Sequence, residues 1–587
     1  MAKEYGFYVF MDPHQDVWSR FSGGSGAPLW TWYACGIDPR SFSTTQAAVV
    51  HNTYPDPATF PKMIWSTNYT RLACQTIFTL FWGGKEYAPK AIIDGQNISD
   101  YLQGHYIAAC KHLAKRIHEA GDLEHDCIIG WETVNEPHRG LISVQDLTAY
   151  PAQQKLHKGT SPTPWQAMLT GSGRACEIDT YDFGSFGPYK TGRELVDPEG
   201  MTMWLSKDYD DTKYGWKRDP EWKLGECIWA QHGVWDASTD TLLKKDYFGK
   251  SPQTGEVLDY EGYTNLFFMQ HYRKYKEAIR SVFKDCFMLL QPPVLEIPPT
   301  IKGTDDDDPL MIFATHYYDG LTLITKHWNR LYNVDVFGVM RGKYLAPAFA
   351  LKVGETAIRN CLRDQLEAIR KEGLEKMGIH PCLFTEIGIP YDMDDKKAYK
   401  TGDYGSQILA MDANHYALEG SGASGFTLWT YVGTTPSISS RPSGTSAELR
   451  ATPGYRAAEA FVRPSPLKTN GSVQKYGFDL KSCTFTLSLE AEKPTVEDQP
   501  TEIYLPEFHF PITRIKVEVS GGKWTISTDE ECGAAVQRLR WWHGEGEQNI
   551  KIEGVKRKAG AYGEGSADSD DYGYLDQCRE LASCSIM

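Results

Sequence analysis

Short apolar runs alternate with amphipathic helical stretches over residues 1 to about 440, and this alternation constrains the fold more than any other feature. The strand-like runs are 7–12, 127–135, 286–291, 311–318, 381–388 and 425–431. Helical patterns lie between them, for example at 106–120, 267–283 and 357–373. Strands that alternate with helices build a parallel sheet, because each helix returns the chain to the start of the next strand. The pattern therefore predicts an α/β fold of the (β/α)8 TIM-barrel kind.

Such a barrel has eight strands, and the sequence supplies six of them. We expect the first two of the eight strands to be lacking in this chain, because the candidate site residues described below suit the ends of strands three to eight. A sheet of six strands leaves two unpaired edges, which predicts poor solubility.

The chain divides into three parts by composition. Residues 1–450 form the predicted barrel, with a long insertion at about 140–260 that is rich in Trp and Tyr. Strict alternation at 483–490 and 514–520 predicts an antiparallel β-sandwich over 455–555. Residues 556–587 are rich in Gly, Ser and Asp, which predicts a disordered tail. The aromatic residues of the insertion either line an apolar ligand site or pack the insertion itself: Trp204, Tyr209, Tyr214, Trp216, Trp222, Trp229 and Trp235.

Charge and cysteine content exclude several classes of function. The net charge is −15 and no basic stripe is present, so nucleic acid is not an expected partner. The 13 cysteines are scattered without CxxC pairs, which argues against a disulfide framework and a zinc site and favours a reducing compartment. No apolar run reaches the roughly 18 residues that span a bilayer. We expect a cytoplasmic or membrane-peripheral protein, with the vacuole as one candidate location.

Two glutamates end predicted strands. Glu136 follows the run 127–135, and Glu386 follows the apolar run that begins at 381. The carboxyl ends of barrel strands meet at one rim, so the two carboxyls can face one another. A pair of carboxyls is what hydrolysis of a glycosidic bond requires, one as acid and one as base or nucleophile. We therefore expect a metal-free and cofactor-free glycosidase, with Glu136 as acid/base and Glu386 as nucleophile.

Further polar and aromatic residues sit at the same predicted rim. His14 and His316 are suited to bind sugar hydroxyls, Tyr318 to donate a hydrogen bond to the nucleophile, and Trp429 to stack on a sugar ring. Asp12 shares a strand face with His14. Each residue taken singly is more often structural, but five strand ends that all carry such groups favour a site.

These motifs resemble glycoside hydrolase family 5, through PHQ at 13–15, NEP at 135–137, HYY at 316–318, TEIG at 385–388 and LWTY at 428–431. The stretches 14–28 and 74–90 resemble the branch that contains endoglycoceramidases and their fungal relatives that act on glucosylceramide and steryl glucosides. The resemblance covers residues 5 to about 550. It implies the roles given above for Glu136 and Glu386, and it implies that Asn135 contacts the 2-hydroxyl of the sugar. The family's second strand usually carries an arginine that supports the nucleophile, and this chain has no counterpart of it.

The long insertion after NEP looks most like that of fungal steryl β-glucosidases. The resemblance thus implies a retaining β-glucosidase that converts ergosteryl glucoside to ergosterol and glucose. A glucosylceramidase or endoglycoceramidase-like glycolipid hydrolase is the alternative within the same chemistry. An inactive glycolipid-binding fragment is the alternative from another class. The oligomeric state is left open.

The sequence ends in CSIM, which matches the C-a-a-X pattern for prenylation of Cys584. A second lipid on Cys578 and the basic run at 556–558 would strengthen attachment to an anionic membrane. This pattern predicts peripheral membrane contact, although four-residue motifs also arise by chance.

Overall fold

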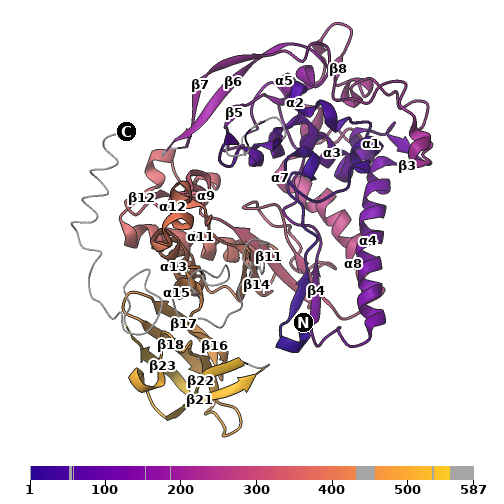
Figure 1. The fold of residues 1–587 in the computed structure, drawn as a ribbon. Helices are drawn as coiled ribbons and strands as arrows, with labels where there is room; N and C mark the ends of the chain where they lie inside the picture. Colours follow the sequence, from indigo (N-terminus) through magenta and orange to yellow (C-terminus); the bar gives the residue numbers. More distant parts are fainter. Residues whose placement is uncertain are drawn as a thin grey trace.

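The computed structural model describes residues 2–430 and 456–555, apart from 52–53, 55, 57–58, 152–153, 185–186 and 532–533 (Figure 1). The predicted disordered tail at 556–587, with Cys578, Cys584 and the basic run, lies outside the described residues. So does Tyr431 at the end of the last predicted strand.

A six-stranded parallel sheet organises the first part of the chain. Its strand order is β1-β4-β10-β11-β14-β15, and every neighbouring pair is parallel. The bounds are β1 (Val9–Met11), β4 (Ile128–Glu132), β10 (Phe287–Leu290), β11 (Met311–Tyr317), β14 (Cys382–Ile387) and β15 (Gly425–Leu428). Each of these strands lies within a run predicted from the sequence, so the fold is that of a (β/α) barrel. Among the described residues, β1 and β15 form the two edges and do not pair with one another.

Long helices separate the strands and cover the sheet: α3 (Leu72–Tyr87), α4 (Ile98–Ala120), α8 (Met269–Arg280), α11 (Glu355–Lys376) and α13 (Gly405–Ser421). Asn97 begins α4 by accepting a hydrogen bond from the backbone N–H of Ser99, and Gly121 ends the helix in the left-handed conformation. In Figure 1, α4 and α8 lie side by side on the outer face of the sheet, and they contact one another. Within the described part of the chain, no helix is long and apolar enough to cross a bilayer.

The insertion between β4 and β10 folds as a set of small elements that pack on the barrel. They include α5 (Pro164–Thr170), the three-stranded sheet β5 (Gly159–Thr160), β6 (Cys176–Gly184) and β7 (Gly187–Val196), and the pair β8 (Trp235–Asp236) and β9 (Thr241–Leu242). The packing interpretation holds for the five tryptophans singled out from the sequence, because all of them are buried within the main hydrophobic core: Trp204, Trp216, Trp222, Trp229 and Trp235.

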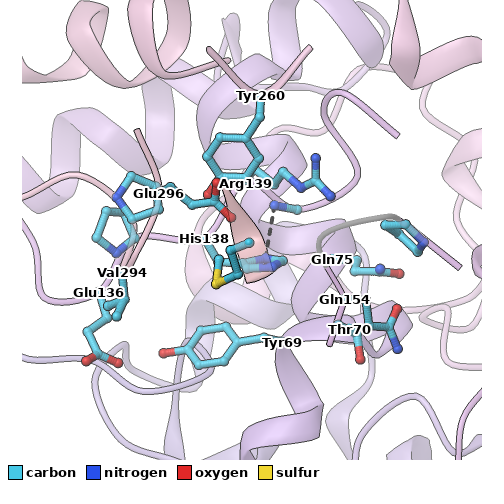
Figure 2. Close-up of a pocket in the computed structure, with 15 residues that line it drawn as sticks. Tyr69, Thr70, Gln75, Glu136, His138, Arg139, Gln154, Tyr260, Val294 and Glu296 are labelled. Carbon is cyan, nitrogen blue, oxygen red and sulfur yellow. Dashed lines mark hydrogen bonds between the residues drawn. The ribbon is translucent and has the colours of Figure 1, made fainter. Parts of the chain in front are cut away.

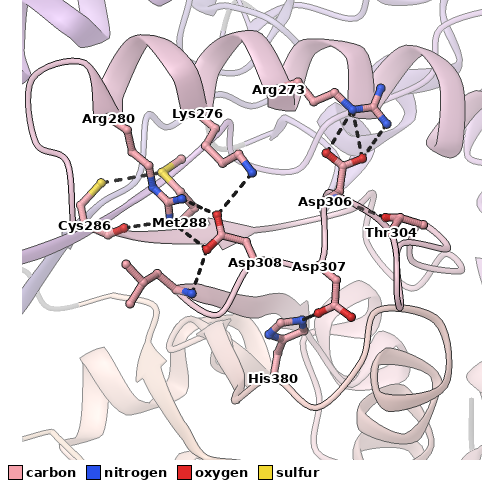
Figure 3. A network of polar contacts seen from close by, with 11 residues as sticks. Arg273, Lys276, Arg280, Cys286, Met288, Thr304, Asp306, Asp307, Asp308 and His380 are labelled. Atoms are coloured by element: carbon pink, nitrogen blue, oxygen red, sulfur yellow. Dashed lines mark hydrogen bonds and ion pairs between the residues drawn. The ribbon is translucent and has the colours of Figure 1, made fainter.

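A run of aspartates at 305–308, between β10 and β11, makes ion pairs with its surroundings rather than forming a free acidic cluster (Figure 3). Asp306 pairs with Arg273 of α8 at 2.7 Å, and Asp308 pairs with Arg280 of the same helix. Asp307 contacts His380 at 2.9 Å. These contacts fasten the loop before β11 to the helix layer, and so they fix the strand that carries His316.

Residues beyond 456 form two four-stranded antiparallel sheets, with orders β16-β19-β22-β21 and β17-β18-β23-β20. The strands are β16 (Ser465–Lys468), β17 (Ser472–Asp479), β18 (Thr484–Ala491), β19 (Thr501–Tyr504), β20 (Lys516–Val519), β21 (Lys523–Glu531), β22 (Ala534–Trp542) and β23 (Gly546–Glu553). Apolar residues of both sheets share one core, for example Phe485 of β18 and Trp541 of β22. The alternation read from 483–490 therefore places Phe485, Leu487 and Leu489 inside, all at most 1% exposed.

A buried ionic cluster joins this C-terminal part to the barrel. Arg463 lies 2.6 Å from Asp412 and 2.6 Å from Glu419, both on α13. The same guanidinium donates to the backbone carbonyl of Phe478 in β17. Because the arginine side chain is only 4% exposed, its charge depends on these two carboxylates.

Candidate active site

The two strand-end glutamates lie together at the carboxyl rim of the sheet. Glu136 follows β4 and Glu386 belongs to β14, so 250 residues of chain separate neighbours in space. Carboxylate oxygens of the two residues and a ring nitrogen of His316 all lie within 4.8 Å of one another. This trio is also close enough to hold a divalent cation. The side chains of Glu136 and Glu386 are 19% and 9% exposed, so both carboxyls are largely shielded from solvent.

Strand β11 and the residue directly after it supply two hydrogen-bond donors to this pair. The Nδ1 atom of His316 lies 3.0 Å from Glu136 and 3.8 Å from Glu386. The hydroxyl of Tyr318 donates to Oε1 of Glu386 at 2.8 Å. The register of the parallel pair explains the placement, because His316 of β11 lies directly beside Glu386 of β14.

Burial and charge repulsion shift the protonation of the site. Burial, together with the neighbouring Glu136, raises the pKa of Glu386 to about 7, although His316 and the Tyr318 hydroxyl oppose the shift. Burial works against the charged form of His316, but the bond to Glu136 and the charges of Glu386 and Asp12 raise its pKa. The pKa of Glu386 therefore lies near neutral pH.

The backbone around Glu136 is held in an uncommon conformation. Its φ of +42° lies in the left-handed region that favours glycine. The N–H of Glu136 donates to Oε1 of Gln291 at 3.1 Å, and its carbonyl accepts from Gln15 at 3.0 Å. Asn135 is fully buried and donates to the carbonyl of Gln15 at 2.8 Å. The predicted strand 127–135 accordingly ends earlier, at Glu132, because this turn redirects the chain to aim Glu136 into the site.

His14 and Trp429 come from the two edges of the sheet and stack on one another, with ring centroids 4.8 Å apart. The Nε2 atom of His14 lies 2.8 Å from Asp16, and this contact raises the pKa of His14. Burial raises the pKa of Asp12, at the end of β1, to about 6. The two edges thus meet at the rim where the glutamates lie.

Several buried polar atoms at this rim have no hydrogen-bond partner within the described residues. They are Oδ1 of Asp12, Nδ1 of His14, Oδ1 of Asn135 and Nε2 of His316. Buried polar atoms without partners are rare in folded proteins, and donors and acceptors grouped in this way suit a polyhydroxyl ligand.

Glu132 is an acid in the site that the sequence reading missed. It is fully buried below the glutamate pair, and Thr385 donates to it at 3.4 Å. Burial, with Asp12 and Glu386 as neighbours, raises its pKa well above the usual range. The sequence feature that indicates Glu132 is its position inside a predicted buried strand, because a glutamate in the middle of an apolar run has to be neutral or paired.

A pocket of about 230 Å³ opens on the Glu136 side of the pair (Figure 2). It is lined by apolar and aromatic groups, including Tyr260, Val294 and Met340, and by the polar residues Arg139 and Glu296. The hydroxyl of Tyr69 points from the pocket toward Glu136 in Figure 2. Glu386 does not line the pocket, and neither do the aromatic residues of the insertion singled out from the sequence.

Comparison with known proteins places this site in context. Residues 463–552 match the model of the glycoside hydrolase family 5 C-terminal domain. The whole chain is 58% identical to a protein of Aspergillus fumigatus named glucosylceramidase, over 85% of that protein's length. Over 97% of the chain it is 38% identical to the ergosteryl-beta-glucosidase of Saccharomyces cerevisiae, covering 83% of that protein.

A solved structure is similar over nearly the same length. The crystal structure of Cryptococcus neoformans sterylglucosidase 1 superposes on this chain with a TM-score of 0.87 at 41% sequence identity. The superposition covers 95% of this chain and 82% of the other. The barrel, the insertion and the C-terminal sheets therefore belong to one shared architecture.

Proposed function

This chain belongs to glycoside hydrolase family 5, and on that premise we propose that it is a retaining β-glucosidase that hydrolyses the glucosyl bond of steryl glucosides, such as ergosteryl glucoside. The spacing of the two carboxyls carries the proposal. Oxygens of Glu136 and Glu386 lie within 4.8 Å, which suits the separation of about 5–5.5 Å in retaining enzymes and is too short for the water that inverting enzymes place between their carboxyls.

In the proposed reaction, Glu136 protonates the glycosidic oxygen while Glu386 attacks the anomeric carbon. Departure of the sterol leaves a glucosyl ester on Glu386. Glu136, now ionised, then removes a proton from water, which attacks the ester and restores both residues. The donors of His316 and Tyr318 support the charge that returns to Glu386. No metal or organic cofactor takes part in this sequence.

The pocket beside Glu136 is the proposed site of the lipid. The acid must reach the oxygen of the leaving group, so the leaving group lies on the side of Glu136. The glucose then lies over the unpartnered polar atoms of Asp12, His14, Asn135 and His316, against Trp429. Glucosylceramide is the second candidate substrate, supported by the 58% identity to a protein that carries the name glucosylceramidase.

We also propose that two further strands belong between β15 and β1 in a complete barrel. The six-stranded parallel sheet supports this, because its two edge strands, β1 and β15, do not pair with one another among the described residues. For the cell, we propose a reducing compartment and contact with a membrane surface. The ten described cysteines form no disulfide with one another, and nine of them are buried.

The test is release of glucose from ergosteryl glucoside and from glucosylceramide, both dispersed in detergent and assayed side by side. Wild type and Glu386→Gln are compared, in this chain and in a form extended by two N-terminal strands, with and without EDTA. We expect hydrolysis that Glu386→Gln abolishes and EDTA leaves unchanged.

Product stereochemistry provides the second readout. Proton NMR of the first-released glucose should show the β anomer. Release of α-glucose, or dependence of the rate on a metal, would contradict the proposed mechanism. A folded, extended enzyme that cleaves neither lipid would favour the glycolipid-binding alternative.

A further inference from the structure

An exposed apolar segment follows α10 (Val336–Met340) on the connection between β11 and α11. We define it as residues 341–354; it contains the 3-10 helix η10 (Pro347–Ala350) and β13 (Leu351–Val353). Four of its large apolar side chains are solvent-exposed: Leu345 (101%), Phe349 (68%), Leu351 (37%) and Val353 (70%). Single exposed apolar residues are ordinary, but four within nine positions of one segment form a surface that calls for a partner.

The apolar segment is held in place by its own contacts. Strand β13 pairs with β12 (Tyr332–Val334) in antiparallel register. The hydroxyl of Tyr344 donates to Asp335 at 2.6 Å, and the Asp335 N–H donates to the carbonyl of Ala350 at 3.0 Å. The exposed side chains are therefore presented by an anchored loop and do not belong to a loose strand end.

The apolar segment begins where the pocket ends. Met340 lines the pocket beside Glu136, and the segment starts at the next residue. Both follow the carboxyl end of β11, so the exposed side chains share the face of the barrel on which the glutamate pair opens.

The charge of the apolar segment differs from that of the whole protein. It contains Arg341, Lys343 and Lys352 and no acidic residue, in a chain with net charge −15. Arg341 pairs with Glu372 and Lys343 with Asp335, while Lys352 lies over the ring of Tyr344 at 5.3 Å. Because carboxylates outside the segment neutralise Arg341 and Lys343, docking on a bilayer rests mainly on the exposed apolar side chains, and attraction of Lys352 to anionic lipid adds to it.

We propose that the apolar segment docks on the surface of a phospholipid bilayer and brings the pocket beside Glu136 to a lipid glucoside held there. This inference rests on the proposed function. A steryl glucoside keeps its sugar at the water interface and its sterol among the acyl chains, so the reactive oxygen lies near the bilayer surface. An enzyme that protonates this oxygen has to meet the bilayer with the face that carries its pocket.

The experiment measures binding of the full chain to vesicles of phosphatidylcholine and phosphatidylserine by co-sedimentation. The protein is produced in bacteria, so that Cys584 carries no prenyl group. The double variant Leu345→Ser/Phe349→Ser removes two exposed apolar side chains, one just before η10 and one within it. The matched control, Leu113→Ser/Ile379→Ser, removes two exposed apolar side chains elsewhere, on α4 and in the loop before β14.

We expect the Leu345→Ser/Phe349→Ser variant to partition at least about tenfold more weakly, and the control variant to bind like wild type. Hydrolysis of ergosteryl glucoside in vesicles should fall with binding, whereas hydrolysis of the detergent-dispersed lipid should stay unchanged. Equal vesicle binding by both variants would overturn the proposal. So would a wild-type dimer, seen by size-exclusion chromatography, that only the Leu345→Ser/Phe349→Ser variant dissociates, because the segment would then be covered by a second copy.

Failure of the proposed function can be told apart from failure of the docking proposal by the assay with detergent-dispersed lipid. If the detergent-dispersed lipid is not hydrolysed by wild type, the substrate assignment fails, and the comparison of vesicle binding still tests the docking surface by itself.

Discussion

Removal of the Tyr318 hydroxyl should move the acidic limb of the pH profile to higher pH. The hydroxyl donates to Glu386 at 2.8 Å, and burial raises its own pKa, so it stays protonated and remains a donor. It stabilises the charged form of Glu386, whose pKa is nevertheless about 7 because burial opposes ionisation. A hydrogen bond to a charged group contributes about 1.5–3 kcal/mol, which corresponds to about one to two pKa units. In Tyr318→Phe the pKa of Glu386 should therefore rise further above its usual range.

The sign follows from the role of Glu386, which must be ionised to attack. Activity is lost as pH falls through its pKa, so a higher pKa moves this loss to higher pH. At pH 6 the variant should be about 10- to 100-fold slower than wild type, and above pH 9 the rates should converge.

The assay is kcat/KM against pH with 2,4-dinitrophenyl β-glucoside. Its leaving group needs no proton, so the profile reports Glu386 without the titration of Glu136. Tyr272→Phe is the matched control, because it removes a buried hydroxyl on α8 that has no partner among the described residues. An acidic limb at the wild-type position, or a uniform loss at every pH, would refute the reasoning.

Three further predictions concern the acid, the ionic cluster and the buried glutamate. Glu136→Ala should slow cleavage of ergosteryl glucoside by about 10²–10⁴-fold but keep the initial burst of dinitrophenol released from dinitrophenyl glucoside, whose leaving group needs no acid. Azide should restore turnover of the variant, with β-glucosyl azide as the product. Loss of the burst would contradict the acid role. Arg463→Met leaves Glu419 buried without its cation, while Asp412 keeps its ion pair with Arg359, and urea titration should show a loss of about 3–5 kcal/mol of unfolding free energy; a loss below about 1 kcal/mol would show that the cluster relaxes. The pKa of Glu132 is raised in the folded protein, so the carboxyl ionises only in the unfolded chain when pH rises above the unfolded pKa, and this destabilises the folded wild type. Glu132→Gln should therefore have a higher melting temperature than wild type at pH 7 and nearly the same melting temperature at pH 4. Equal melting temperatures of variant and wild type at pH 7 would show that Glu132 is ionised in the folded protein.

The strands and the rim glutamates were predictable because each depends on a local pattern. A strand buried on both faces needs a continuous apolar run, and a glutamate directly after such a run has to lie at the rim. The family resemblance, and with it the reaction class, followed from these same residues, and the comparisons confirm both.

The pocket that we propose for the lipid was less predictable, because it depends on contacts between distant segments. The insertion is rich in tryptophan, yet its tryptophan side chains pack against the hydrophobic core and do not line the pocket. The pocket is built instead from the turns after β4 and β10 and from the end of α10, where Arg139, Val294 and Met340 converge. No regular spacing of apolar residues in the sequence marks a place where such distant segments converge. The protonation of Glu132 likewise depends on three other carboxyls that approach it only in the fold.

Selectivity between the two lipids should depend on one buried amide in the pocket. Contacts with apolar groups such as Val294 and Met340 serve a sterol and a ceramide alike, so they discriminate weakly. Gln75 also lines the pocket, is 2% exposed, and its Oε1 atom has no partner among the described residues. A ceramide offers an amide N–H and a hydroxyl close to the glycosidic oxygen, whereas a sterol offers hydrocarbon only.

Gln75→Leu should therefore reduce kcat/KM for glucosylceramide relative to ergosteryl glucoside by about 5- to 150-fold, the equivalent of about 1–3 kcal/mol for one buried hydrogen bond. Gln103→Leu is the matched control, because Gln103 is equally buried with an unpartnered Oε1 but lies on α4, outside the pocket. If the ratio of the two lipids moves equally in both variants, Gln75 does not contact the lipid. A ratio that moves in Gln75→Leu alone identifies this amide as the group that admits ceramide, and it locates the amide bond of the lipid beside α3.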